Sequence, residues 1–71
     1  LQALKSATGS LSAGGIITIA LYTGHPGGSD EADSVMQWAR DLSQEQYSVS
    51  KYEFINQRNS PPSLLAIGRK A

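Results

Sequence analysis

The sequence predicts an α/β fold in which helices alternate with strands, and three observations carry this prediction. Apolar residues recur at helical spacing at the start of the chain and again in its middle. A β-branched apolar run at residues 16–22 lies between two glycine pairs. The last third of the chain holds two more strand-like segments, separated by a proline pair. The order helix, strand, helix, strand, strand implies a parallel pair with a right-handed crossover, followed by an antiparallel hairpin.

Composition narrows the class of protein. The chain has 71 residues, enough for one domain with a small core. It has no cysteine and one histidine, so we expect neither disulfides nor a metal site. Six basic residues balance six acidic ones, which gives no electrostatic footprint for nucleic acid or a membrane. No apolar run approaches the ~20 residues that a membrane span requires.

The first predicted helix is the end of a longer one. Leu1, Leu4, Ala7 and Leu11 recur at helical spacing. The stretch "SAGG" that follows ends the helix, because glycine is favoured just past a helix end. Since the chain starts with a leucine and inside this periodic pattern, we expect an upstream part of the protein to be missing.

The run "IITIALY" at residues 16–22 is apolar on both faces, which predicts a strand buried in a sheet between helix layers. A short core helix is the alternative, but the flanking glycines favour a strand. A second helix then begins with Ser29 as its N-cap and runs to about Gln44. Its first turn carries acidic residues that suit the helix dipole rather than catalysis, namely Asp30, Glu31 and Asp33.

The segment "YSVSKYEFINQ" at residues 47–57 predicts the second strand. Its apolar residues change parity between Val49 and Tyr52, which a bulge near Ser50 or Lys51 would reconcile. The third strand, at residues 64–69, follows a proline pair that cannot belong to a central strand. Four large side chains are expected in the core: Met36, Trp38, Tyr52 and Phe54.

Two motifs together carry a family resemblance, "YTGHPGG" after the first strand and "KYEFINQRNSPPSLLAIGRK" at the end of the chain. Nearly all of the chain resembles the carboxyl-terminal part of the YtqB-like class I methyltransferases, long labelled rRNA methylases. That family is assigned to methylation of the aminomethyl group on a modified wobble uridine in tRNA. The resemblance implies a cytoplasmic enzyme that uses S-adenosylmethionine and acts on tRNA or another RNA.

The resemblance also implies a Rossmann-like fold to which this chain contributes the fifth, sixth and seventh strands and two helices. The chain should form a three-stranded mixed sheet, with two parallel strands and an antiparallel strand between them. The family's cofactor-binding half has no counterpart in this sequence, which contains no G-x-G-x-x-G. We therefore expect no cofactor-binding residue here and no activity from these 71 residues alone.

The candidate site lies where two strands end. His25 follows the first strand, and the stretch "NQRN" follows the second. If the two strands are parallel, both segments emerge at the same edge of the sheet. This is the edge at which α/β folds bind ligands. His25 is the candidate general base for the proton that a methylated amine loses. The candidate substrate-binding residues are Tyr22, Gly27, Gly28, Asn56, Gln57, Arg58 and Asn59.

These residues have different expected roles. Tyr22 could stack on a base, and the amides of "NQRN" could bind a pyrimidine edge. Gly27 and Gly28, with the helix start behind them, could hold a phosphate through backbone N–H groups. The alternative is that His25 and the glycines only form a turn, while the amides cap strand ends.

Two other functions stay open at this point: a small non-enzymatic module that binds a phosphate or nucleotide, and a self-associating structural fragment. If the family's fourth strand is missing, residues 16–22 form an open edge that is apolar on both faces. We then expect a homodimer through this edge, or association with the missing upstream half.

Overall fold

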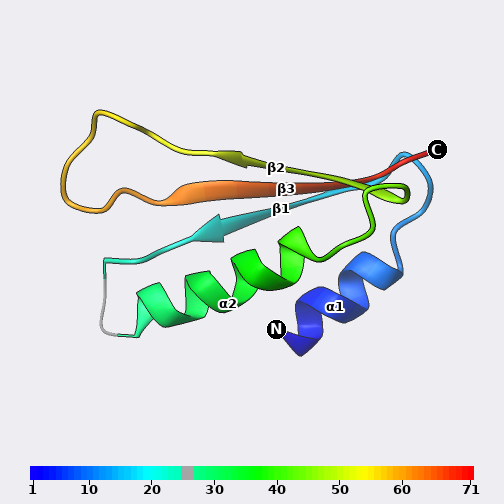
Figure 1. Cartoon of the computed structure of the whole chain (residues 1–71), viewed down its shortest axis with the longest axis horizontal. Coiled ribbons are helices and arrows are strands. Elements are labelled where there is room, and N and C mark those ends of the chain that lie inside the picture. Colours follow the sequence, from blue (N-terminus) through cyan, green and yellow to red (C-terminus); the bar gives the residue numbers. More distant parts are fainter. Residues whose placement is uncertain (25–26) are drawn as a thin grey trace.

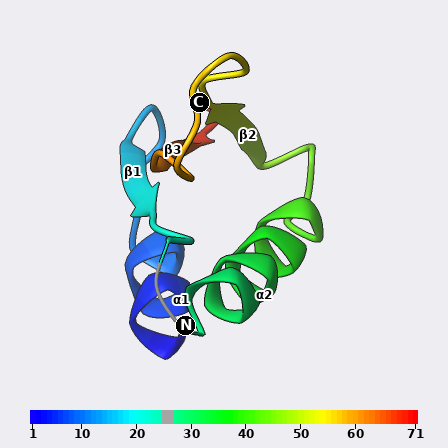
Figure 2. The same cartoon turned by 90° about the vertical axis from the view of Figure 1, so that its left-hand side faces the viewer.

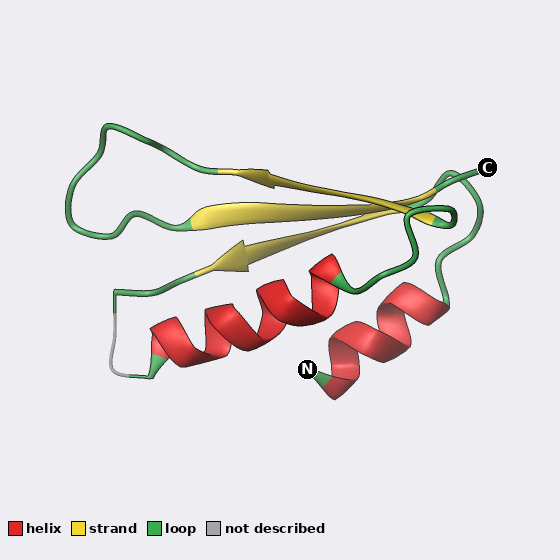
Figure 3. Cartoon of the chain, viewed as in Figure 1, coloured by secondary structure: helices red, strands yellow, loops and turns green. Residues whose placement is uncertain are grey.

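The protein forms a three-stranded sheet with two helices packed on one of its faces (Figures 1 and 2). The computed structural model describes residues 1–24 and 27–71. The predicted alternation of helix and strand is confirmed (Figure 3). In chain order the elements are α1 Gln2–Gly9, β1 Ile16–Leu21, α2 Gly28–Arg40, β2 Tyr47–Tyr52 and β3 Ser63–Arg69.

The strand order is β1-β3-β2, and both outer strands are antiparallel to β3. The predicted position of the third strand between the other two is confirmed, and β1 and β2 run in the same direction. The description of the sheet as mixed is wrong, because every hydrogen-bonded pair is antiparallel and β1 never pairs with β2. The physical reason is that β3 turns back into the gap and supplies the backbone partners of both outer strands.

The pairing of β2 with β3 is continuous. Each residue from Tyr47 to Tyr52 has one partner, from Arg69 to Leu64, so the predicted bulge is absent between these strands. The strand also ends at Tyr52, five residues before its predicted end at position 57. The apolar residues change parity because this regular strand carries apolar side chains on both of its faces. Val49 lies on the face that the helices cover, and Tyr52 lies on the opposite face.

The covered face of the sheet holds the core. β3 is the central strand, so its Leu65 and Ile67 are fully buried at 0% exposed. Met36 and Trp38 pack against this core, as predicted. The buried apolar residues are Leu21, Ala32, Val35, Ala39, Leu65 and Ile67.

Only one face of the sheet is covered, and this corrects two expectations. β1 is not buried on both faces: its residues alternate in burial, and Ile16 is 66% exposed. Tyr52 and Phe54 do not belong to the core, since they are 68% and 51% exposed. Apolar character identified these residues as core candidates, but it did not reveal that both helices would pack on the same side.

Both helices differ from their predicted limits. α1 ends at Gly9, and α2 ends at Arg40 rather than near Gln44. Ser29 is not the N-cap of α2, because Gly27 occupies that position in a left-handed conformation with φ 80° and Ser29 already lies in the first turn. Glycine adopts this conformation without the steric cost that Cβ imposes.

Two long-range hydrogen bonds tie the end of α1 to the sheet. The Tyr47 hydroxyl donates to the carbonyl of Thr8 at 3.5 Å, and the Arg69 guanidinium donates to the carbonyl of Leu11 at 2.8 Å. They add donors to carbonyl groups at and just beyond the helix end, and the Thr8 carbonyl also accepts from the backbone N–H of Leu11. Neither of the two described helices has the length and apolar character to cross a membrane.

Candidate functional site

The loops that follow β1 and β2 meet at one end of the sheet (Figure 1). A Cβ atom placed on Gly24 would lie 3.8 Å from the carbonyl oxygen of Ser60 and 3.9 Å from its Cβ. Gly24 belongs to the β1–α2 loop, and Ser60 belongs to the β2–β3 loop. The two segments that carry the sequence-predicted site are therefore brought together, as the parallel direction of β1 and β2 requires.

The β1–α2 loop places Tyr22 directly after β1, with its side chain 61% exposed. His25, the candidate base, lies outside the described residues. Its neighbours Gly24 and Gly27 are both solvent-exposed. These two glycines are therefore accessible to a ligand at this end of the sheet.

The β2–β3 loop carries the four polar candidates, which are all exposed. The side-chain amide of Gln57 donates to the Oδ1 atom of Asn56 at 3.2 Å. Arg58 and Asn59 continue the loop toward the contact with Gly24. Hydrogen bonding between neighbouring amides orients both of them and leaves other donor and acceptor positions for a base edge.

Two residues of this loop have unusual backbone conformations. Asn59 has φ 66° and Ser60 has φ 50°, both in the left-handed region. Asparagine tolerates this region, whereas serine adopts it rarely. Such conformations cost about 1–3 kcal/mol each and persist only where surrounding structure holds them. Ser60 is also the residue that meets Gly24.

The start of α2 offers less to a phosphate than its glycines suggest. Gly27 is exposed, but Gly28 is buried. No side chain caps the helix, and Asp30 and Glu31 lie in its first turn. These carboxylates already interact with the positive end of the helix dipole and repel a further anion. The observed geometry thus favours the turn function of these glycines.

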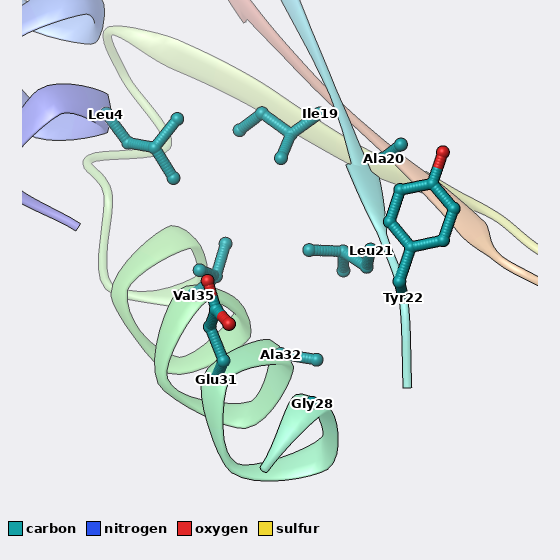
Figure 4. Close-up of a pocket in the computed structure, with 9 residues that line it drawn as sticks. All are labelled: Leu4, Ile19, Ala20, Leu21, Tyr22, Gly28, Glu31, Ala32 and Val35. Atoms are coloured by element: carbon teal, nitrogen blue, oxygen red, sulfur yellow. The ribbon is translucent and has the colours of Figure 1, made fainter. Parts of the chain in front are cut away.

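An apolar pocket of about 250 Å³ lies between β1 and the two helices (Figure 4). Leu4 of α1, Ile19 of β1 and Val35 of α2 point toward one another across it, and Glu31 contributes its carboxylate (Figure 4). β1 is an edge strand, so the backbone groups on its outer side have no strand partner within the described sheet. Residues 19–22 at the end of this strand line the pocket, so the pocket lies beside the open edge.

The described residues do not fit a complete nucleotide cofactor. The pocket beside β1 is lined mainly by apolar side chains, and Glu31 is its only charged residue. The sequence contains no G-x-G-x-x-G loop to approach a phosphate or ribose. Within residues 1–24 and 27–71, no three acidic or histidine side chains gather to hold a metal ion.

Residues 1–68 match the protein family described as "Putative rRNA methylase". The chain belongs to this family. A chloroplastic tRNA (mnm(5)s(2)U34)-methyltransferase of Arabidopsis thaliana is 34% identical over 61 residues. That alignment covers 86% of this chain and 22% of the relative, so the chain spans about a fifth of the relative's length.

Solved structures of similar proteins share the fold described above. A "putative rRNA-methylase" from Clostridium thermocellum superposes with a TM-score of 0.91 at 38% identity, over 96% of this chain and 37% of that one. A "putative methyltransferase" from Streptococcus mutans, solved in complex with SAH, has a TM-score of 0.88 at 34% identity. The superposition covers 94% of this chain and 36% of that protein.

Sequence reasoning missed two parts of this site. The contact between Gly24 and Ser60 was not anticipated, because it depends on the left-handed turn at positions 59 and 60. The sequence predicts Tyr52 and Phe54 in the core, whereas both are exposed at the end of β2. Their change of parity within residues 47–57 was the available signal, since it moved them off the face that carries Val49.

Proposed function

We propose that this chain forms the RNA-facing part of an S-adenosylmethionine-dependent RNA methyltransferase. The proposed substrate is the aminomethyl group of a modified wobble uridine in tRNA. Membership of the rRNA methylase family supports the reaction class, and the name of the Arabidopsis relative supports the substrate. The observation that carries the proposal is the meeting of the two loops at Gly24 and Ser60, next to the predicted site residues.

In the proposed reaction the chain holds and deprotonates the amine. A neutral nitrogen is required as the nucleophile, so a proton must be lost, and His25 is the proposed acceptor. The amides of Asn56, Gln57 and Asn59 would bind the edge of the modified base, and Arg58 would contact the RNA backbone. Because the reacting groups must be held in line and in close contact, this positioning is expected to supply much of the rate.

We further propose that these 71 residues act together with other residues that hold the methyl donor. The chain covers only 37% of the Clostridium relative and 36% of the Streptococcus mutans relative. The open edge of β1 and its apolar pocket are the proposed contact with the remainder of the catalytic domain, or with a second copy. A cytoplasmic location stays a prediction, since the Arabidopsis relative is named as chloroplastic.

The test measures methyl transfer by the natural full-length polypeptide that contains this sequence. Radiolabelled S-adenosylmethionine is supplied with tRNA that carries the aminomethyl uridine, and with ribosomal RNA as the competing substrate. We expect His25→Ala and Asn59→Ala to lower the rate on tRNA by about 10²-fold or more. Gln46→Ala is the matched control, because this exposed residue lies beside the opposite end of the sheet.

Three results would count against the proposal. Methylation of ribosomal RNA but not tRNA would refute the substrate and keep the reaction class. Absence of methyl transfer to both tRNA and ribosomal RNA by the unaltered polypeptide would refute the reaction class. Wild-type rates in His25→Ala and Asn59→Ala would show that these residues only shape turns.

A further inference from the structure

Tyr52 and Phe54 form an exposed aromatic pair at the end of β2. Their ring centroids lie 6.0 Å apart, with the planes inclined by 79° in an edge-to-face arrangement. Tyr52 is 68% exposed and Phe54 is 51% exposed. Each ring therefore restricts its neighbour while a large part of the pair stays open to water. Adjacent exposed aromatic side chains of this kind are typical of binding surfaces.

The pair lies on the side of the sheet that no described helix covers. Lys51 pairs with Leu65, which is fully buried under the helices, so the next residue along β2 points to the other face. On that face Tyr52 pairs with Leu64, itself 39% exposed. Figure 2 shows both helices on the opposite side of the sheet. Packing within the described chain thus does not explain why two aromatic residues are placed here.

Charge at this end of the sheet favours a polyanion. The net charge is zero, but residues 28–45, which include α2, hold five acidic residues and one basic residue. Of the four basic residues in 46–71, Arg69 and Lys70 lie at the opposite end of the sheet, where they donate to the carbonyls of Leu11 and Gln44. Lys51 contacts Glu53 at 3.1 Å in an exposed ion pair, which is weak in water. Arg58 is exposed in the loop that follows the pair, so a phosphate backbone is attracted to this loop and repelled by α2.

The position of the pair connects it to the candidate site. β2 ends at Tyr52, and the loop after Phe54 leads to Ser60, which meets Gly24 of the other loop. The pair therefore lies at the same end of the sheet as the loops that would receive a nucleotide. A neighbouring nucleotide of the same strand would reach it.

We propose that the aromatic pair is a stacking surface for an unpaired nucleobase of RNA, next to the nucleotide that enters the two loops. This inference rests on the proposed action on RNA. Every base has an aromatic face, so stacking on Tyr52 and Phe54 holds a single-stranded segment with little dependence on its sequence. A base within a double helix is already stacked and cannot occupy this surface.

The test measures binding of the natural full-length polypeptide to two fluorescent RNA hairpins of equal length. One hairpin has an unpaired seven-nucleotide loop, about the size of an anticodon loop, and the other is paired except for a minimal turn. We expect Tyr52→Ala and Phe54→Ala each to weaken binding of the looped hairpin about tenfold. Tyr52→Phe keeps the ring and should bind within about twofold of the unaltered protein.

Ile55→Ala is the matched control, because Ile55 is adjacent in sequence, apolar and 94% exposed. It should bind the looped hairpin as the unaltered protein does. The alanine variants should keep the salt dependence of binding, since no phosphate contact is removed. Circular dichroism should show the same folded content in all variants.

Two results would overturn the inference. The first is unchanged binding of the looped hairpin by Tyr52→Ala and Phe54→Ala. The second is dissociation of a dimer on these substitutions in sedimentation, which would assign the pair to contact between copies. Failure of the proposed methyl transfer is a separate result, because it appears in the unaltered polypeptide and in the transfer assay.

Discussion

Ile67→Ala is expected to remove most of the stability of the 71-residue chain. Ile67 is fully buried in the central strand, paired with Ile17 on one side and Val49 on the other. The substitution loses about 0.8 kcal/mol for each of roughly three buried carbons, and the cavity adds to this. A total loss of about 3–4 kcal/mol follows. A single core in a chain of this size supplies only about 3–5 kcal/mol.

Urea unfolding followed by fluorescence measures this loss. Trp38 is the only tryptophan in the chain and packs against the core, so its emission reports on unfolding. Ile67→Val should cost about 1 kcal/mol and give a graded intermediate. Ile55→Ala should change nothing, because that side chain is 94% exposed. Protein concentration is held constant, since association would add to the apparent stability.

An Ile67→Ala chain that unfolds at the same urea concentration as the unaltered chain would refute the reasoning. So would equal losses in Ile67→Ala and Ile55→Ala. Either result would mean that the Ile67 side chain does not pack in the core as its burial implies.

Three further predictions concern the loop, the cofactor and the open edge. Gly27→Ala should cost about 1 kcal/mol of stability. The cost comes from backbone strain alone, because Gly27 has φ 80° and a Cβ atom added there would meet no other atom within 4 Å. Equal melting temperatures of the unaltered and the Gly27→Ala protein would contradict this. Calorimetry of the isolated 71-residue chain should detect no micromolar binding of S-adenosylmethionine, and such binding would show that the cofactor site lies within it. In sedimentation at tens of micromolar the isolated chain should associate through β1. Thr18→Lys places a charge on this exposed edge strand and should reduce the association. If the unaltered chain is already a monomer, the edge is not an interface.

The order of the elements could be predicted from the sequence because local signals agree with one another. The β-branched run at residues 16–22 lies between glycines, and the proline pair separates the last two strands. The exposure of Tyr52 could be suspected only from the change of parity in its segment, since an apolar residue near a strand end suits either face until the positions of the helices are known. The N-cap of α2 could not be predicted either. Gly27, in a left-handed conformation, occupies this position in place of Ser29, two residues later.

The candidate site was predictable in part. Parallel directions of β1 and β2 are enough to bring their following loops to one end of the sheet. The contact of Gly24 with Ser60 needs more, because it depends on the left-handed turn at positions 59 and 60. The roles of His25 and Asn59 stay predictions, since His25 lies outside the described residues.

The placement of β3 between β1 and β2 also has a consequence for how the chain folds during synthesis. Ile16 pairs with Gly68, 52 positions further along the 71-residue chain, whereas the β2–β3 hairpin is local. Contacts between distant residues form slowly, because a long loop must close before they contribute. The hairpin is therefore expected to form first and to capture β1 afterwards. Until the ribosome has released residue 69, β1 and β2 have no strand between them and depend on the helices to shield their apolar side chains.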